Sequence, residues 1–158
     1  MRGPIVKLAR LATVGYQGTT VQRVMDVLRE ARIEVLVDVR AVASSRRPGF
    51  SKSRLAAHLE EAGIGYLHLR GLGTPAEGRA AARAGRHEEM RRIFTGHLSM
   101  PEAQAELEHL AEVIRSGQRS CLLCFEADHR HCHRTIVAAA VSALVPVDVV
   151  HLAPHQGE

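Results

Sequence analysis

The sequence predicts an α/β domain built around a mostly parallel sheet. Short apolar, β-branched runs alternate along the chain with segments whose apolar residues recur at helical spacing. The 158 residues contain no linker, internal repeat or low-complexity tract, and the length suits one domain with a core of its own. We therefore expect a single domain over residues 1–158, with its core at about 12–152. Five strands flanked by helices would form a Rossmann-like, three-layer arrangement.

The first half of the chain is predicted to alternate three strands with two helices. The second strand is apolar on both faces, as in a strand buried within a sheet. In the first helix, apolar residues recur at i, i+3, i+4 and i+7 from Val21, after a threonine that can cap it. The second helix begins after Ser51 and ends at Gly63. In order, these elements are strand 12–15, helix 19–33, strand 34–40, helix 52–62 and strand 64–69.

The second half is predicted to contain three helices and two strands. Gly85 weakens the first of these helices, and Pro101 lies at the start of the second. The last helix is apolar nearly all round, which predicts that it is deeply buried. In order, these elements are helix 76–95, helix 99–117, strand 120–126, helix 133–144 and strand 147–152.

Composition narrows the function without naming it. A net charge of +4 and a pI near 9.4 permit an anionic ligand or nucleic acid but require neither. Two tyrosines, three phenylalanines and no tryptophan argue against a base-stacking platform for single strands. Three cysteines within residues 121–132 suggest no disulfide framework. We expect no signal peptide and no membrane span, and hence a cytoplasmic protein.

The polar motifs of the chain fall at predicted strand ends. In open α/β sheets, ligands bind beyond the carboxyl ends of the strands, which lie along one edge. We therefore expect these motifs to share one site. They are GYQG at 15–18, DVR at 38–40, GLG at 71–73 and CFEADHRHCHR at 124–134.

The last of these motifs has the residue types of a zinc site. Cys121 and Cys124 have the C-x-x-C spacing, and His129, His131, Cys132 and His133 could complete a set of four ligands. A strand, however, points residues three apart to opposite faces, which makes Cys121 a core residue. We predict no cofactor and no metal ligand. Zinc held by Cys124, Cys132 and nearby histidines is kept as an alternative.

The start of the last helix is a candidate anion site. The first N–H groups of a helix are unpaired and its dipole is positive there, and Arg134 adds a guanidinium. The same field would lower the pKa of Cys132 and make it reactive. Cys124 and Arg130 match the C-x5-R phosphate loop of cysteine phosphatases, but the two carboxylates and the lack of glycine between them argue against that loop.

The loop after the second strand is a second candidate anion site. Residues 40–54 carry five positive charges and no carboxylate. Ser45 and Arg46 offer a hydroxyl and a guanidinium that suit phosphate or carboxylate. A solvated basic loop is the structural alternative. Five arginines among residues 79–92 alternate with glutamates, which is typical of a solvated helix face, with a lid or nucleic-acid contact as the alternative.

Two smaller signals complete the predicted edge. Asp38 ends a buried strand, so its carboxylate needs a partner, for which Arg40 and Arg134 are candidates. Gly15, followed by Tyr16, lies in a loop where the backbone can come close to a ligand. The full dinucleotide fingerprint G-x-G-x-x-G is absent.

Several of these motifs together resemble the DUF488 family of small prokaryotic proteins. The motifs TVGYQG, LVDVR, SRRPGFSK, YLHLRGLG and LLCFEADHRHCHR occur in the expected order from Thr13 to Leu152. Ala43 departs from the family pattern, which usually has proline there. The resemblance implies an α/β fold and an unassigned function. It also implies a motif set: Gly15, Asp38, Arg40, Ser45, Arg46, Phe50, His68, Leu72, Gly73, Cys124, Glu126, Cys132, His133 and Arg134.

The sequence therefore favours an enzyme with one anion pocket at the carboxyl edge of the sheet. Its ligand would be a nucleotide, a nucleic acid or a phosphorylated small molecule. A nucleotide- or nucleic-acid-binding module without turnover is the alternative, a thiol redox or zinc-binding protein is a second, and a homodimer is left open. The predicted catalytic residues are Asp38, Glu126, Cys132 and His133. The predicted binding residues are Gly15, Tyr16, Arg40, Ser45, Arg46, Phe50, His68, Gly73 and Arg134.

Overall fold

A parallel sheet forms the centre of the protein. The computed structural model describes residues 8–154. The sheet has five strands, all paired in parallel, in the order β3-β2-β4-β1-β5. The strands are β1 (Ala9–Gly15), β2 (Val35–Asp38), β3 (Gly65–His68), β4 (Ser120–Cys124) and β5 (Val147–His151). The predicted α/β class and five-stranded parallel sheet are confirmed.

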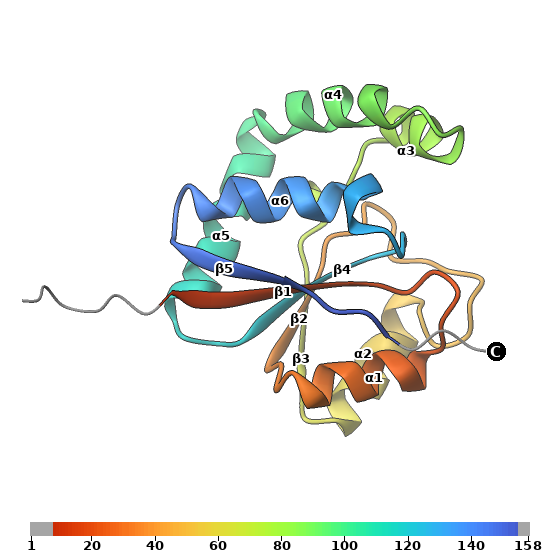
Figure 1. The fold of residues 1–158 in the computed structure, drawn as a ribbon, viewed down its shortest axis with the longest axis vertical. Coiled ribbons are helices and arrows are strands. Elements are labelled where there is room, and N and C mark those ends of the chain that lie inside the picture. The colour runs from red at the N-terminus through yellow and green to blue at the C-terminus, as the bar shows by residue number, and fades with distance from the viewer. Residues whose placement is uncertain (1–7, 155–158) are drawn as a thin grey trace, which may run out of the picture.

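Helices cover both faces of this sheet. In Figure 1, α1 and α2 lie below the sheet and α6 lies above it, with α3 and α4 in an outer layer beyond α6. The helices are α1 (Val21–Glu30), α2 (Lys52–Glu61), α3 (Ala76–Arg83), α4 (His87–Leu98), α5 (Pro101–Arg115) and α6 (His133–Ser142), with short 3-10 turns η1 (Arg70–Leu72) and η2 (His129–His131). No helix within residues 8–154 is long and apolar enough to cross a bilayer.

One predicted helix is divided in two. The sequence pattern indicated a single helix over 76–95, but α3 ends at Arg83 and α4 begins at His87. Gly85 lies between them with φ of +78°, a left-handed conformation that glycine adopts without a steric penalty. The break lets α3 fold back against α4.

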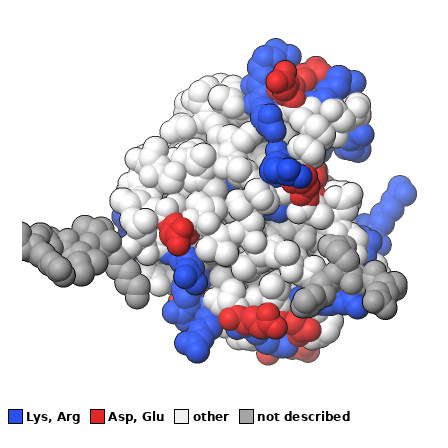
Figure 2. Space-filling model, viewed as in Figure 1, with Lys and Arg blue, Asp and Glu red and all other residues white. Residues whose placement is uncertain are grey.

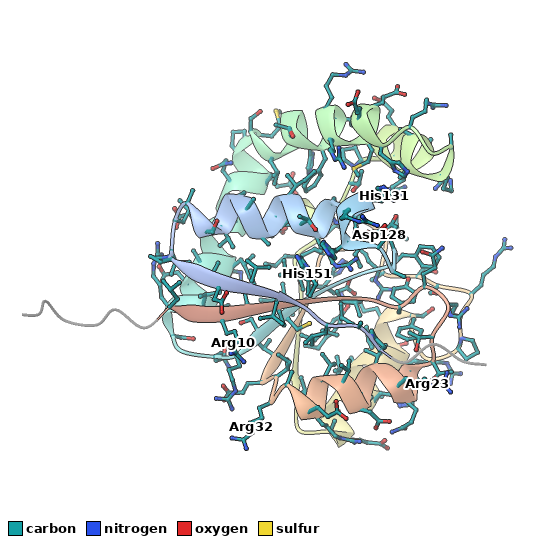
Figure 3. The ribbon with its side chains drawn as sticks, viewed as in Figure 1. Arg10, Arg23, Arg32, Asp128, His131 and His151 are labelled. Carbon is teal, nitrogen blue, oxygen red and sulfur yellow. The ribbon has the colours of Figure 1, made fainter. Side chains whose placement is uncertain are left out.

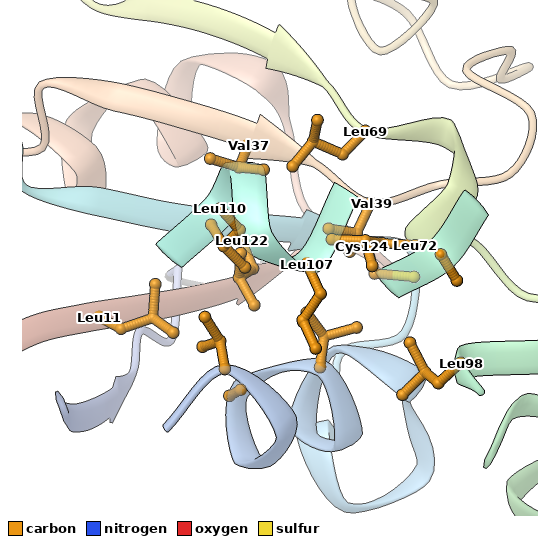
Figure 4. Packing of buried hydrophobic residues seen from close by; sticks show 14 of the residues in the cluster. Leu11, Val37, Val39, Leu69, Leu72, Leu98, Leu107, Leu110, Leu122 and Cys124 are labelled. Atoms are coloured by element: carbon orange, nitrogen blue, oxygen red, sulfur yellow. The ribbon is translucent and has the colours of Figure 1, made fainter. Parts of the chain in front are cut away.

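The core is divided by the sheet. Cys121 and Leu123 of β4 face α1 and α2, whereas Leu122 and Cys124 face α5 and α6. Figure 4 shows Leu122 and Cys124 with Leu107, one of the leucines that α5 contributes to this layer. The predicted alternation of Cys121 and Cys124 is therefore confirmed, and Cys121 is a fully buried core residue.

Local capping positions the loops at the carboxyl edge. Thr20 caps α1, where its hydroxyl accepts a hydrogen bond from the Arg23 N–H. Ser51 stands at the N-cap of α2 but makes no side-chain cap hydrogen bond. Its hydroxyl instead accepts from the Ser45 N–H and donates to the Ser45 carbonyl, at 3.1 and 3.0 Å. These bonds close the basic loop on itself beside the sheet.

Candidate active site

A buried ion pair joins the end of β2 to the loop that follows it. Arg40 Nε lies 2.9 Å from Asp38 Oδ1, and Nη2 lies 2.7 Å from Oδ2, so the contact is bidentate. Tyr66 Oη also donates to Oδ2, at 2.7 Å, and the Arg40 N–H donates to Oδ1. Burial and then the Asp38 carboxylate raise the pKa of Tyr66. Both oxygens of the Asp38 carboxylate therefore have partners within the protein.

Arg40 also connects two further loops. Its Nη1 donates to Tyr16 Oη at 3.1 Å and to the Phe50 carbonyl at 2.7 Å. The rings of Tyr16 and Phe50 stack with their centroids 4.3 Å apart. Burial alone would lower the pKa of Arg40. The hydrogen bonds and charge of Asp38 outweigh burial, so the pKa of Arg40 lies above its usual value. Arg40 is thus a fixed cation whose hydrogen bonds hold Asp38, Tyr16 and Phe50 together.

Arg134 holds the loop after β4. Its side chain is 1% exposed, and its Nε donates to Thr13 Oγ1 at 3.1 Å. Its Nη1 donates to the Glu126 carbonyl at 2.5 Å. Gly15 makes this approach possible, because a Cβ there would collide with the same carbonyl oxygen. The loop is therefore fixed to β1 by a glycine and a buried arginine.

Two thiols and one imidazole meet beneath this loop. His133 Nδ1 lies 3.4 Å from Cys124 Sγ and 3.9 Å from Cys132 Sγ. His133 Nε2 lies 2.7 Å from the Val39 carbonyl oxygen. Because a carbonyl only accepts, Nε2 carries a proton and Nδ1 faces the sulfurs. We call Cys124, Cys132 and His133 the Cys-His cluster.

The Cys-His cluster is electrostatically coupled. Burial opposes ionisation of Cys132, but hydrogen bonds from Cys124 and His133 outweigh it and lower the pKa of the Cys132 thiol well below its usual value. Burial would lower the pKa of His133, yet the neighbouring Cys132 sulfur raises it. Burial, reinforced by Cys132, raises the pKa of Cys124 and of Glu126. These opposite shifts favour negative charge on the Cys132 sulfur and positive charge on the His133 ring.

A cavity of about 360 Å³ opens above the cluster at the carboxyl edge of the sheet. Cys124, His133 and Glu126 line it, and Glu126 Oε2 lies 3.4 Å from Cys124 Sγ. The lining also includes two arginines of α3, together with serines of the basic loop and apolar side chains. These lining residues are Arg79, Arg83, Ser44, Ser45, Tyr16, Val42, Met90 and Phe125. The cavity therefore combines positive charge with a thiol, an imidazole and a carboxyl group.

The structure brings the predicted residues to one edge but gives them different positions. Five of them line the cavity: Tyr16, Arg40, Ser45, Glu126 and His133. Cys132 lies behind this lining, 2% exposed. Asp38 and Arg134 lie deeper, in contacts with protein atoms. Arg46 is exposed and is not part of the lining.

Three other predicted residues support the walls. Phe50 is fully buried under Tyr16. His68 contacts the Arg40 carbonyl oxygen through Nε2, at 2.8 Å. At Gly73, a Cβ would collide with the backbone of Ala41, so a glycine is required for this close approach. These three residues therefore do not line the cavity but support residues that do.

Sequence reasoning missed Arg79 and Arg83 as cavity residues. The charge pattern of residues 79–92 favoured a solvated helix face, with a lid or nucleic-acid contact as the alternative. A signal was nevertheless present, because α3 begins directly after the loop that follows β3, at the same edge of the sheet. Arg79 Nη1 donates to the Thr74 carbonyl at 3.0 Å, whereas Arg83 is exposed.

Comparison with known proteins identifies the family. The family model described as Domain of unknown function DUF488 matches residues 20–141, which is most of the chain. The chain belongs to the DUF488 family. No match was found among curated proteins or among solved structures.

The motifs that resembled the DUF488 family surround the cavity in this DUF488 protein. They supply Arg40 and Ser45 from the loop after β2, and Glu126 and His133 from the loop after β4 and the start of α6. The Cys-His cluster is also the group within residues 8–154 whose donor atoms, all within 4.8 Å of one another, could hold a metal ion. His129 and His131, which the sequence offered as ligands, are not part of that group.

Proposed function

We propose that this DUF488 protein is an enzyme that acts on a nucleotide or another small phosphorylated molecule bound in the cavity. The observation that carries the proposal is a shared cavity, which is lined by Cys124, His133 and Glu126 and also by Arg79 and Arg83. Concave sites with a few convergent polar groups and perturbed titratable residues are typical of small-molecule sites.

The phosphate contacts in this proposal come chiefly from α3. The guanidinium groups of Arg40 and Arg134 bind protein oxygens, which leaves them little capacity for a ligand. Arg83 has no hydrogen bond or ion pair to any residue in the described range 8–154 and lines the cavity. The hydroxyls of Ser44 and Ser45 can add hydrogen bonds. Arg40 and Asp38 become positioning residues.

Glu126 is the proposed general acid or base. Its carboxyl group lines the cavity, and burial raises its pKa above the usual value of a glutamate, which favours a role as proton donor. His133 Nδ1 lies 3.4 Å from Cys124 Sγ and 3.9 Å from Cys132 Sγ, and Cys124 is the thiol that lines the cavity. One carboxyl group, two thiols and an imidazole exceed what binding alone requires.

A nucleic-acid module is the weaker candidate. Figure 2 shows arginines over α3 and α4 with carboxylates among them, so the basic surface of this face is interrupted by negative charge. Nucleic-acid binding without turnover would need a basic stripe along the backbone of the ligand. A concave cavity of about 360 Å³ suits a small ligand better.

Glu126→Gln tests the proposed activity, because it removes proton transfer at nearly constant volume. Wild type and variant would be assayed for release of phosphate or base from a panel of nucleotides and sugar phosphates. We expect turnover to fall by about 10²-fold or more, with ligand affinity within about tenfold. Binding by both proteins without turnover by either would identify a binding module instead.

A further inference from the structure

The spacing of the Cys-His cluster matches the ligand edges of a tetrahedral metal site. Zinc bonds of about 2.3 Å to sulfur and about 2.0–2.1 Å to nitrogen place tetrahedral S and N ligands about 3.5–3.6 Å apart. The distances from His133 Nδ1 are 3.4 Å to Cys124 Sγ and 3.9 Å to Cys132 Sγ, one on either side of this value. A cation would need only small side-chain shifts to bind all three groups.

The imidazole is oriented as a metal ligand would be. His133 Nε2 donates to the Val39 carbonyl at 2.7 Å, which directs Nδ1 and its lone pair at the sulfurs. A backbone carbonyl on the opposite ring nitrogen is the usual outer contact of a metal-bound histidine, because it fixes the tautomer and the ring orientation. The rings of Phe94 and His133 make a T-shaped contact, with centroids 5.0 Å apart.

One side of the cluster is open. Cys124 and His133 line the cavity, whereas Cys132 lies behind them. Three protein ligands and one open position facing a cavity are typical of catalytic zinc, while structural zinc has four protein ligands. Glu126 is not among the groups within 4.8 Å of one another, but its Oε2 lies 3.4 Å from Cys124 Sγ. The carboxyl group therefore stands beside the open position.

We propose that Cys124, Cys132 and His133 bind one Zn²⁺ whose fourth position faces the cavity. This inference rests on the proposed function and gives its active site a chemical class: metal-assisted hydrolysis or transfer. The cation supplies a Lewis acid at the floor of the cavity. Cys132 is then a ligand and not a nucleophile, and Glu126 transfers protons at the open position.

Cobalt titration of the full chain tests the site directly. The purified protein would be freed of metal with a chelator and titrated with Co²⁺, and absorption would be recorded. We expect an intense thiolate-to-cobalt band in the near ultraviolet and visible bands of tetrahedral cobalt, which saturate at one Co²⁺ per chain and disappear on addition of Zn²⁺. A folded wild-type protein without the thiolate band in excess Co²⁺ would overturn the proposal.

Two substitutions test the ligands, and a third is the control. Cys132→Ser and His133→Gln should abolish the thiolate band or shift its intensity to that of fewer ligands. Cys121→Ala removes the buried thiol on the other face of β4 and should leave the band unchanged. If the ligand variants fail to fold, the wild-type titration alone still decides the question.

The same protein separates this inference from the proposed function. Phosphate compounds would be titrated into the metal-free and the reconstituted forms. Phosphate binding without any thiolate band would remove the metal site and leave the anion-binding enzyme. A thiolate band without binding of any phosphate compound would leave the metal site and remove the anion-binding enzyme.

Discussion

His133 Nε2 lies 2.7 Å from the carbonyl oxygen of Val39, and this hydrogen bond connects the start of α6 to the chain just after β2. The contact joins residues 94 positions apart and sets the direction of the opposite ring nitrogen. The Cys-His cluster is therefore aligned by the backbone of a neighbouring strand end, and a displacement of that strand end would misalign it.

The buried pair of Asp38 and Arg40 should dominate the stability of the carboxyl edge. Asp38→Asn leaves the Arg40 guanidinium buried without a counter-charge, and we expect a loss of about 3–5 kcal/mol in the free energy of unfolding. Urea denaturation measures this loss. Asp26→Asn is the control, since Asp26 pairs with Arg29 on the surface at 3.7 Å, and it should cost less than about 1 kcal/mol. Equal effects of both substitutions would refute the structural role of Asp38.

Gly15 and Gly96 should respond in opposite ways to alanine. A Cβ at Gly15 would collide with the Glu126 carbonyl oxygen, so Gly15→Ala must displace the loop after β4. A Cβ at Gly96, in α4, meets no atom within 4 Å. We expect Gly96→Ala to stabilise the protein by about 0.5–1 kcal/mol, and Gly15→Ala to destabilise it and disturb the Cys-His cluster. Thermal denaturation of the two variants compares them, and a stabilised Gly15→Ala would contradict the packing described here.

His151 should make stability fall in mild acid. Its Nδ1 lies 2.6 Å from Thr13 Oγ1, which also accepts a hydrogen bond from Arg134 Nε. The His129 ring stacks on it with centroids 3.6 Å apart. Figure 3 shows His151 on β5. Burial, followed by the charges of His129 and Arg134, lowers the pKa of His151.

The direction of this pH dependence follows from the difference in proton binding between the folded and the unfolded protein. The unfolded chain takes up a proton at this ring near pH 6.5, before the folded protein does, so unfolding is favoured as the pH falls. The contribution of His151 to the free energy of unfolding is complete above about pH 6.5. It is lost as the pH falls toward the lower pKa that His151 has in the folded protein. Urea denaturation between about pH 7.5 and pH 5 should show a shallower decline for His151→Gln than for wild type. His109→Gln, at an exposed position of α5, is the control, and an unchanged slope in His151→Gln would contradict the account.

Patterns of short range predicted much of the fold and part of the site. The period of a strand was sufficient to place Cys121 and Cys124 on opposite faces of β4, because successive residues in a strand alternate in direction. The rule that ligands bind at the carboxyl edge brought Glu126 and His133 to one place. The need of a buried carboxylate for a partner restricted Asp38 to two arginines, of which the structure selects Arg40.

Other features depended on packing that local patterns do not contain. Helical periodicity assigns Arg83 to a solvated face, and only the fold of α3 back against α4 brings it to the cavity. That fold requires the break at Gly85, which a pattern of apolar residues does not distinguish from a weak helix position. The contact of His133 with Val39 is a side-chain-to-backbone bond across the sheet and leaves no periodic trace in the sequence.

Isothermal titration with phosphate compounds tests the central claim, that the cavity binds a phosphorylated ligand against α3. Pyrophosphate and nucleoside phosphates would be titrated at fixed ionic strength into wild type, Arg83→Ala and Arg92→Ala. Arg92 is exposed on α4 and does not line the cavity, so its variant controls for overall charge. We expect a ligand whose affinity falls at least about tenfold in Arg83→Ala and stays near wild type in Arg92→Ala. Binding that is lost equally in both variants, or no binding of any phosphate compound, would contradict the claim.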